Sequence, residues 1–280
     1  MRRFQQIDVF SPTPLEGNAL AVVHDAEGLT TEQMLAFTRW TNLSEATFLL
    51  PPTDPAADYR VRIFTLVGEL DFAGHPTLGT CHAWLSAGGV AKSGDAIVQE
   101  CPAGLVRLRR IDDVLAFEAP PVKRDGAVSA ADLDRICSIL GIGTESVIDS
   151  SWVDNGPGWV AVLLGTAEEV LAIRPRDDGG DQIDIGIVGP QPAGSETAWE
   201  IRAVFTAAIG GLREDPVTGS LNASVAQWLI RTGRAQAPYV ASQGTVMGRS
   251  GRPMISQDEE GMIWVGGATH TLIEGEVSFD

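Results

Sequence analysis

The sequence contains an internal repeat. Residues 61–65 read Val-Arg-Ile-Phe-Thr and residues 201–206 read Ile-Arg-Ala-Val-Phe-Thr, and each segment is typical of a short β-strand. Further along each half, a polar residue precedes a proline, as His75-Pro76 in the first and Asp215-Pro216 in the second. Because these landmarks occur in the same order, the chain is predicted to fold as two similar halves.

An amphipathic helix is expected after each of these prolines. The first carries Leu78, Cys81 or His82, and Leu85, and the second carries Leu221, Val225, Trp228 and Leu229 at helical spacing. Gln99 and Gln243 lie fifteen residues after Trp84 and Trp228, and each is expected to open a further strand. The two halves are therefore of the α+β class.

Other signals complete this organisation. Capping patterns at Thr30 with Gln33 and at Ser129 with Asp132 predict two more helix starts. Strands are expected at residues 4–10, 18–23, 46–50, 60–65, 105–109, 114–118, 158–164, 201–206 and 262–266. The Pro-rich stretch at 119–121 favours a division into residues 1–125 and 126–280, with a strand or terminus able to cross over. The polar loop 174–181 is expected to be disordered or to form a flap.

Charge and composition exclude several classes of partner. The chain has 20 Lys and Arg against 37 Asp and Glu, a net charge of −17, and no basic stripe, which disfavours nucleic-acid binding. No apolar run approaches the roughly 20 residues of a membrane span, and no apolar leader follows Met1. We therefore expect a cytoplasmic protein whose partner is a small molecule.

Residue types also limit the chemistry. The two lysines, Lys92 and Lys123, lie in polar turn sequences, which gives no good candidate for a Schiff base. The three cysteines and four histidines show no metal-ligand spacing, and no glycine-rich phosphate loop is present. If the chain is an enzyme, we expect it to work with no cofactor and no metal.

The two proline motifs predict two anion-binding helix starts. Proline suits the first helical position, so His75 and Asp215 are expected at N-caps with free backbone N–H groups just beyond them. Gly79, Gly219 and Ser220 would let a ligand approach the backbone closely. If the halves are related by a twofold axis, both starts would face one cleft and bind a carboxylate. Taken singly, each motif is more typical of an ordinary helix cap, and it is the pair in register within the repeat that favours an anion site.

Glu45 is the candidate for acid–base chemistry. It precedes the apolar segment Ala-Thr-Phe-Leu-Leu, where partial burial would raise its pKa toward the range useful for proton transfer. A water-exposed carboxylate in a helix-to-strand linker is the alternative interpretation of the same position.

Four segments carry a resemblance to a known family. Gly17–Val23, Asn42–Leu49, Gly74–Thr80 and Glu214–Ser220 resemble the signature segments of the phenazine-biosynthesis PhzF-like family. The resemblance runs from residue 4 to about residue 270. It implies the diaminopimelate epimerase fold, in which two pseudo-symmetric α+β halves each wrap a mixed sheet around a central helix.

The resemblance also implies an activity. Family members isomerise trans-2,3-dihydro-3-hydroxyanthranilate by proton transfer without a cofactor, and Glu45 matches the glutamate that acts as acid and base. His75 and Asp215 would hold and polarise the substrate. The remaining positions implied for substrate binding are Asn18, Gly74, Gly79, Thr80, Thr218, Gly219 and Ser220. A homodimer is expected from the family alone.

Two alternatives stay open, and the first is an epimerase or racemase of the same fold. Such enzymes place a cysteine at each helix start, but residues 72–80 and 212–220 contain none. Cys81, Cys101 and Cys137 are therefore interpreted as structural, as is His82. After Ser220 the chain reads Leu-Asn, where phenazine enzymes commonly have Ala-His. That departure leaves open a protein that binds a small carboxylate without turning it over.

Overall fold

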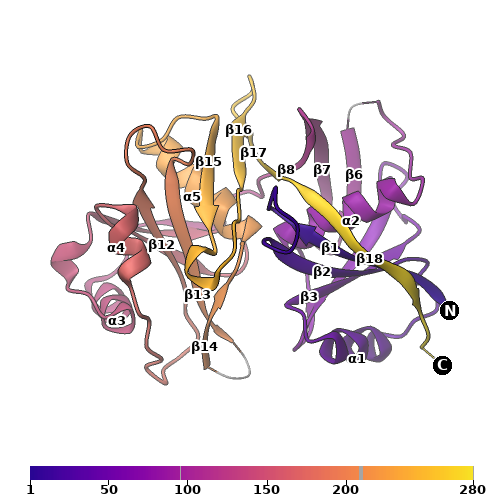
Figure 1. The fold of residues 1–280 in the computed structure, drawn as a ribbon, viewed down its shortest axis with the longest axis horizontal. Helices are drawn as coiled ribbons and strands as arrows, with labels where there is room; N and C mark the ends of the chain where they lie inside the picture. The colour runs from indigo at the N-terminus through magenta and orange to yellow at the C-terminus, as the bar shows by residue number, and fades with distance from the viewer. Residues whose placement is uncertain (95, 208–210, 280) are drawn as a thin grey trace. The chain divides into compact units, whose positions relative to one another are not determined.

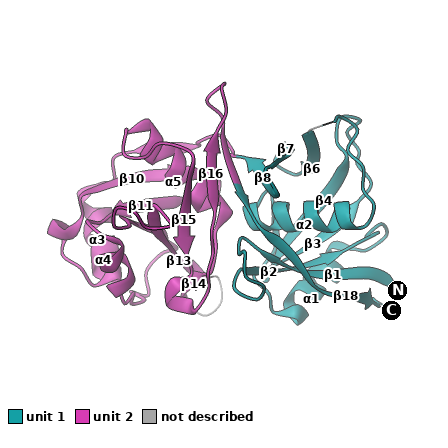
Figure 2. Cartoon of the chain, turned by 45° about the horizontal axis from the view of Figure 1, so that its top comes forward, with its two compact units in different colours: residues 1–118, 266–280 teal, residues 119–265 magenta. Residues whose placement is uncertain are grey.

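The chain forms two compact units in the computed structural model, which describes residues 1–94, 96–207 and 211–279. The first unit combines Met1–Glu118 with Gly266–Asp280, and the second is Ala119–Val265 (Figure 2). The boundary between the units falls after Glu118 and not at the predicted residue 125. The C-terminal residues return to the first unit, which is the kind of terminus crossover that the prediction allowed.

The first unit is a mixed sheet around one helix (Figure 1). Its elements are β1 (Arg2–Val9), β2 (Asn18–Val23), α1 (Thr31–Thr41), β3 (Glu45–Leu50), β4 (Tyr59–Thr65), β5 (Glu69–Leu70), α2 (Gly74–Ser86), β6 (Ala96–Cys101), β7 (Gly104–Ile111), β8 (Val114–Glu118) and β18 (Thr269–Val277). Strands β2 and β3 are parallel, as are β4 and β6, and the other pairs are antiparallel. Helix α2 packs on β1, β2, β3, β8 and β18.

The second unit repeats this plan. Its elements are β9 (Arg124–Gly126), α3 (Ala130–Leu140), β10 (Asp149–Asp154), β11 (Trp159–Leu163), α4 (Ala167–Ala172), β12 (Asp184–Pro190), β13 (Trp199–Ala207), β14 (Gly211–Asp215), α5 (Gly219–Arg231), β15 (Tyr239–Gln243), β16 (Met254–Gln257) and β17 (Ile263–Gly267), with 3-10 turns at Thr144–Ser146 and Thr245–Met247. Strands β11 and β12 are parallel, as are β13 and β15. Helix α5 packs its apolar face on β10, β11, β12, β13 and β15.

Strand register confirms the repeat in detail. Arg62 of β4 pairs with Phe48, three residues into β3 from Glu45, and Arg202 of β13 pairs with Ile187, three residues into β12 from Asp184. In each unit a hairpin strand follows, and the helix begins four residues after that strand ends. The two α+β halves predicted from the repeat are therefore confirmed, and with them the diaminopimelate epimerase type of fold that the family resemblance implies.

The same register shows that the two proline motifs are not equivalent. Pro76 is the third residue of α2, whereas Pro216 lies three residues before α5 begins. Glutamines 99 and 243 also differ from the prediction, because they lie at or near the end of their strands and do not open them. Counting from the helix starts, His75 corresponds to Ser220, and Leu70 corresponds to Asp215.

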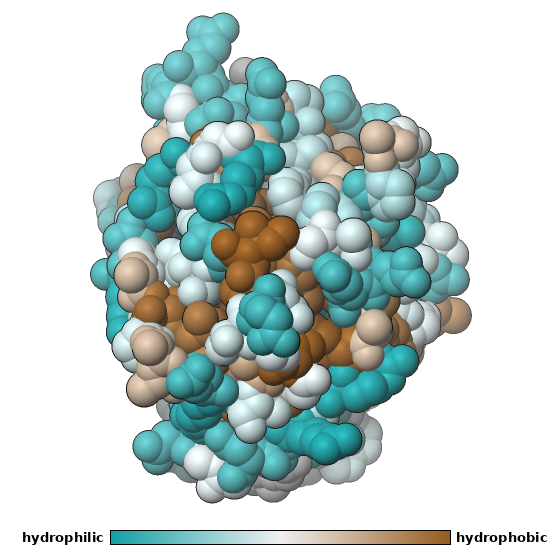
Figure 3. Space-filling model, turned by 90° about the vertical axis from the view of Figure 1, so that its left-hand side faces the viewer, coloured by the Kyte–Doolittle hydropathy of each residue, from teal (hydrophilic) through white to brown (hydrophobic). Residues whose placement is uncertain are grey.

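Alternation along the strands separates two core layers in each unit. In β3, Ala46 and Phe48 pack with Met34 and Phe37 of α1, while Thr47 accepts a hydrogen bond of 2.8 Å from Thr80 of α2. In the second unit, α3 and α4 cover a separate apolar cluster on the opposite face from α5. On the side of the molecule that carries α3 and α4, apolar residues reach the surface among polar ones (Figure 3).

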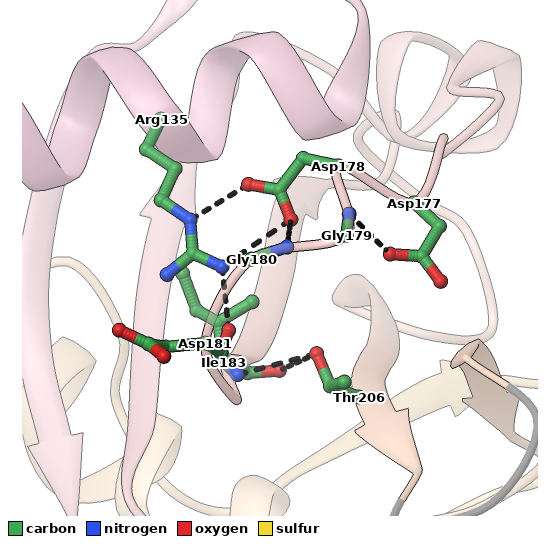
Figure 4. Close-up of polar contacts among 8 residues, drawn as sticks. All are labelled: Arg135, Asp177, Asp178, Gly179, Gly180, Asp181, Ile183 and Thr206. Carbon is green, nitrogen blue, oxygen red and sulfur yellow. Dashed lines mark hydrogen bonds and ion pairs between the residues drawn. The ribbon is translucent and has the colours of Figure 1, made fainter.

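The loop at 174–181 is held by hydrogen bonds (Figure 4). Of the two alternatives predicted for it, the structure disagrees with disorder and does not test a flap. Arg135 Nε donates to Asp178 Oδ2 at 2.7 Å, and Gly179 N donates to Asp177 Oδ1 at 2.9 Å. The guanidinium of Arg135 and the N–H of Gly180 hold the pKa of Asp178 at about 2. These contacts fix the loop beside α3.

None of the helices in the described ranges is long and apolar enough to cross a membrane.

Candidate functional site

Glu45 and His75 meet where β3 and α2 begin. The Nε2 of His75 lies 3.5 Å from Oε2 of Glu45, and their side chains are 5% and 16% exposed. Glu45 opens β3 beside Leu20 of β2, and His75 is the second residue of α2. Strand and helix thus start at the same end of the unit, which brings together two residues that are distant in sequence.

Asn18 sets the tautomer of His75. Its Nδ2 lies 3.3 Å from His75 Nδ1, and since an amide nitrogen can only donate, Nδ1 is the acceptor and the imidazole proton is on Nε2. Burial lowers the pKa of His75 from 6.5 to about 3. The imidazole of His75 is therefore neutral with its protonated Nε2 on the side of Glu45, and the 3.5 Å approach is a polar contact without hydrogen-bond geometry.

The turn before Asn18 requires glycine. Gly17 N donates to the buried carboxylate of Asp8 at 3.1 Å, and a Cβ at Gly17 would lie 2.3 Å from the carbonyl oxygen of Val9. Asn18 then pairs with Val9 at the start of β2. This close approach fixes the start of β2, from which the Asn18 amide reaches His75 Nδ1.

The two central helices begin without side-chain caps. In α1, α3 and α4 the N-cap side chains of Thr30, Ser129 and Thr166 each accept a hydrogen bond from the first turn. Ala73 and Thr218, the N-caps of α2 and α5, accept none. Within the described residues, the N–H groups of Gly74 and His75, and those of Gly219, Ser220 and Leu221, donate to no other group.

These helix starts are nonetheless buried. Gly74, His75, Gly219 and Ser220 all belong to the buried class. A buried N–H without a partner costs free energy, and an anion at a helix start can satisfy several such groups together. The starts of α2 and α5 thus have the properties of anion sites.

Ser220 is held in one orientation at the start of α5. Trp159 Nε1 donates to Ser220 Oγ at 3.1 Å, and Asn155 Nδ2 donates to the Ser220 carbonyl at 2.9 Å. Because the indole N–H occupies the oxygen, the Ser220 hydroxyl hydrogen is left to donate elsewhere. No described group accepts it.

Asp215 is braced through Thr218 and Gln243. The Thr218 hydroxyl donates to Asp215 Oδ2, and Gln243 Nε2 donates to the Asp215 carbonyl at 3.1 Å and to Thr218 Oγ1 at 2.9 Å. Asn222 Nδ2 donates to Gln243 Oε1 at 2.7 Å. This network explains why Thr218 does not cap α5, since its hydroxyl is directed at Asp215.

Two details of the predicted site are wrong. His75 and Asp215 are not N-caps, because the caps are Ala73 and Thr218. His75 lies inside the first turn of α2, and Asp215 ends β14. The prediction assumed that proline takes the first helical position. The first N–H groups of a helix have no intrahelical partner, so proline is equally tolerated at the third position, where Pro76 lies.

Gly79 and Thr80 occupy packed positions. A Cβ at Gly79 would lie 2.6 Å from Leu20 Cδ2 and 3.0 Å from Val9 Cγ2, so this glycine lets α2 pack closely on the sheet. The Thr80 hydroxyl is engaged with Thr47. We therefore assign both residues to packing of the helix, whereas Gly74 and Gly219 contribute buried backbone N–H groups to the helix starts.

Sequence reasoning missed several residues at the start of α5. Trp159, Asn155 and Gln243 come from β11, the turn before it and β15. Asp184, at the start of β12, was also missed. Aligning the repeat on Arg62 and Arg202 places Asp184 within one residue of the position of Glu45, and that was the available signal; the strand register supplies the exact match.

The cysteines are buried thiols. Cys81, Cys101 and Cys137 are all free, and burial raises the pKa of Cys81 to about 12. His82 is held on both ring nitrogens by Thr269 and Thr271 of β18. Across residues 1–94, 96–207 and 211–279, no group of three His, Cys, Asp or Glu side chains is arranged to hold a metal ion.

Comparison with known proteins identifies the family. The model of the family described as phenazine biosynthesis-like protein (PhzC-PhzF) matches residues 7–275. The chain is 33% identical over 264 residues to trans-2,3-dihydro-3-hydroxyanthranilate isomerase of Pseudomonas fluorescens, covering 89% of this chain and 88% of that one. It is also 33% identical over 291 residues to antisense-enhancing sequence 1 of Schizosaccharomyces pombe, covering 98% and 97%.

A solved structure shares the fold. The PhzF-family protein of Bacillus anthracis superposes with a TM-score of 0.81 at 20% identity, and the match covers 99% of both chains. Together with the family match over most of the chain, this agrees with the duplicated sheet-and-helix plan. The chain therefore belongs to the PhzC-PhzF, or PhzF-like, family and is an isomerase of that family.

Proposed function

We propose that this isomerase moves a proton on a small cyclic or unsaturated carboxylic acid similar to trans-2,3-dihydro-3-hydroxyanthranilate, with Glu45 as general base and acid. The observation that carries the proposal is the 3.5 Å approach of the neutral His75 Nε2 to Glu45 Oε2. This approach sets the Glu45 side chain beside the N–H donor of His75, at the start of α2, which has no side-chain cap.

The reaction needs no redox change. The Glu45 carboxylate takes a proton from one carbon of the substrate, and the double bond shifts as the electron pair delocalises. The resulting carboxylic acid returns the proton to a different carbon, so Glu45 ends as it began. His75 acts as a neutral donor that holds an oxygen or nitrogen of the substrate, because its low pKa keeps it from becoming a cation.

The start of α5 supplies the carboxylate-binding group. The N–H groups of Gly219, Ser220 and Leu221 and the Ser220 hydroxyl provide donors without a described acceptor. Hydrogen bonds to an anion are shorter and stronger than hydrogen bonds between neutral groups. Asp215, braced by Thr218, is proposed to accept a hydrogen bond from a polar substituent of the substrate.

The departure after Ser220 is compatible with this role. Leu221 packs against Gly186, and Asn222 donates to the Thr218 carbonyl at 2.9 Å and to Gln243. Both side chains thus contact the protein core and stabilise the first turn of α5. The homodimer remains a prediction from family membership.

Turnover in D2O tests the proposal. The purified chain should convert trans-2,3-dihydro-3-hydroxyanthranilate, or a close cyclic relative, to an isomer that carries solvent deuterium, as followed by proton NMR. Binding of such acids with no isomer and no deuterium incorporated would instead show the carboxylate-binding protein that lacks turnover.

A further inference from the structure

The proposed reaction leaves one buried carboxyl group unused. Asp184 begins β12, and the residue is 8% exposed. Its Oδ1 is fully buried and has no hydrogen-bond partner among the described residues. A buried polar atom without a partner is uncommon and calls for a ligand or a proton.

Asp184 occupies the position in the second unit that Glu45 occupies in the first. Glu45 pairs with Leu20 of β2 and Thr65 of β4, and Asp184 pairs with Trp159 of β11 and Phe205 of β13. Each carboxyl residue is the first of its strand. The duplicated fold therefore carries a carboxyl group at both equivalent places.

Strand alternation directs Asp184 toward α5. A Cβ at Gly186 would lie 2.6 Å from Leu221 Cδ1, which places Gly186 on the face of β12 that α5 covers. Residues two apart in a strand share a face, so Asp184 is on that face too. Asp184 is closer than Gly186 to the start of β12, just as Glu45, beside His75, lies at the start of β3.

Few charges act on this group. Asp154, at the end of β10, is a like charge that disfavours a second carboxylate nearby. Register places Arg213 and Asp215 of β14 on the same face, whereas Arg202 of β13 is turned to the α4 carbonyls of Val170 and Ile173. Strand β11 and the first turn of α5 carry no charged residue.

We propose that Asp184 is a proton-carrying binding residue, which in its acid form donates a hydrogen bond to a carboxylate held at the start of α5. The inference rests on the proposed function only in taking the ligand to be a carboxylic acid. Ligand binding at this helix start is then accompanied by uptake of a proton, which forms the O–H of Asp184 and lets two carboxyl groups share one negative charge.

Burial agrees with this role. It raises the pKa of Asp184 to about 6, against the lowering effect of a hydrogen bond with the Gln182 side chain, and Asp154 adds to the rise. Above that pH the free protein holds Asp184 ionised. A bound carboxylate brings a further negative charge, which raises the pKa again and draws in the proton.

Calorimetry with benzoate tests the linkage. Heats of binding measured at pH 7 in PIPES and in imidazole give the number of protons taken up. The wild type should take up close to one proton per benzoate, and affinity should fall up to about tenfold per pH unit above pH 7. Asp184→Asn should abolish the uptake and make affinity independent of pH, while Asp215→Asn should keep the uptake.

A measurement on the wild type removes any dependence on folding of the variant. With Asp labelled at 13Cγ, one resonance should titrate near pH 6 and move to higher pH when benzoate is added. No binding of benzoate at millimolar concentration, binding without proton uptake, or unchanged uptake in Asp184→Asn would each overturn the proposal. Glu45→Gln should retain the uptake, so loss of isomerase activity alone leaves this inference standing.

Discussion

His75 Nε2 lies 3.5 Å from Glu45 Oε2, and His75 Nδ1 is held by Asn18 at 3.3 Å. The imidazole thus has one nitrogen fixed by the protein and the other directed at the proposed acid–base group. This arrangement is built by β2, β3 and α2 of one unit.

His75 should stay neutral at every pH where the enzyme works. Its pKa falls from 6.5 to about 3 on burial, so 15N NMR should show one tautomer, protonated at Nε2, from pH 5 to 8. The unfolded chain binds a proton at this residue below pH 6.5 and the folded chain does not. Stability is therefore lost as the pH falls from 6.5 toward 3, by up to about 3–5 kcal/mol. His75→Gln should lack this loss in urea unfolding, and equal pH profiles for both proteins would contradict it.

Gly17→Ala should destabilise the first unit. The new Cβ would lie 2.3 Å from a backbone oxygen of Val9, so the turn must shift, at a cost of about 1–3 kcal/mol. Because Asn18 follows, turnover should fall as well. Gly275→Ala is the matched control, since nothing lies within 4 Å of its Cβ position. Similar urea midpoints for the two variants would show that the close approach at Gly17 is not strained.

Ser220→Ala should weaken substrate binding more than turnover. It removes the hydroxyl donor and leaves Trp159 Nε1 without its acceptor, while the backbone N–H groups of α5 remain. KM should rise about tenfold, the effect of roughly 1.4 kcal/mol, with kcat changed little. Trp159→Phe tests the orienting bond separately and should raise KM by a smaller factor. A fall in kcat at constant KM in Ser220→Ala would assign Ser220 to the chemical step.

The cysteines should be dispensable. Cys81 is fully buried, and its pKa of about 12 leaves almost no thiolate at neutral pH. Iodoacetamide should therefore label the native protein slowly and leave activity intact, and Cys81→Ala should turn over like the wild type. Rapid inactivation on alkylation of Cys81 would favour the racemase mechanism with a thiol.

The fold was predictable because two of its signals recur. Strand patterns around Arg62 and Arg202 and the capping residues Thr30 and Ser129 correspond to elements of the structure. Helix α4 was missed although Thr166 and Glu169 form a capping box, since only six residues follow as helix. Short helices give too few turns for a periodic apolar pattern.

The site was predictable only in part. Glu45 and His75 were found from motifs, and the structure brings them together. The helix starts were misplaced by the prolines, which fit the first turn in more than one position. Trp159 and Asn155 bind Ser220 from other strands and turns, and Asp184 shares the α5-facing side of β12 with Gly186, so no local pattern marks these residues.

The most direct test of the central claim is solvent exchange with Glu45→Gln. Glutamine keeps the shape and the contact with His75 but cannot accept the proton, so both isomerisation and deuterium incorporation from D2O should fall by about 10² or more. Benzoate binding should remain, which shows that the protein is folded. A Glu45→Gln variant that still exchanges deuterium into substrate or product at the wild-type rate would contradict the assignment of Glu45 as the acid–base group.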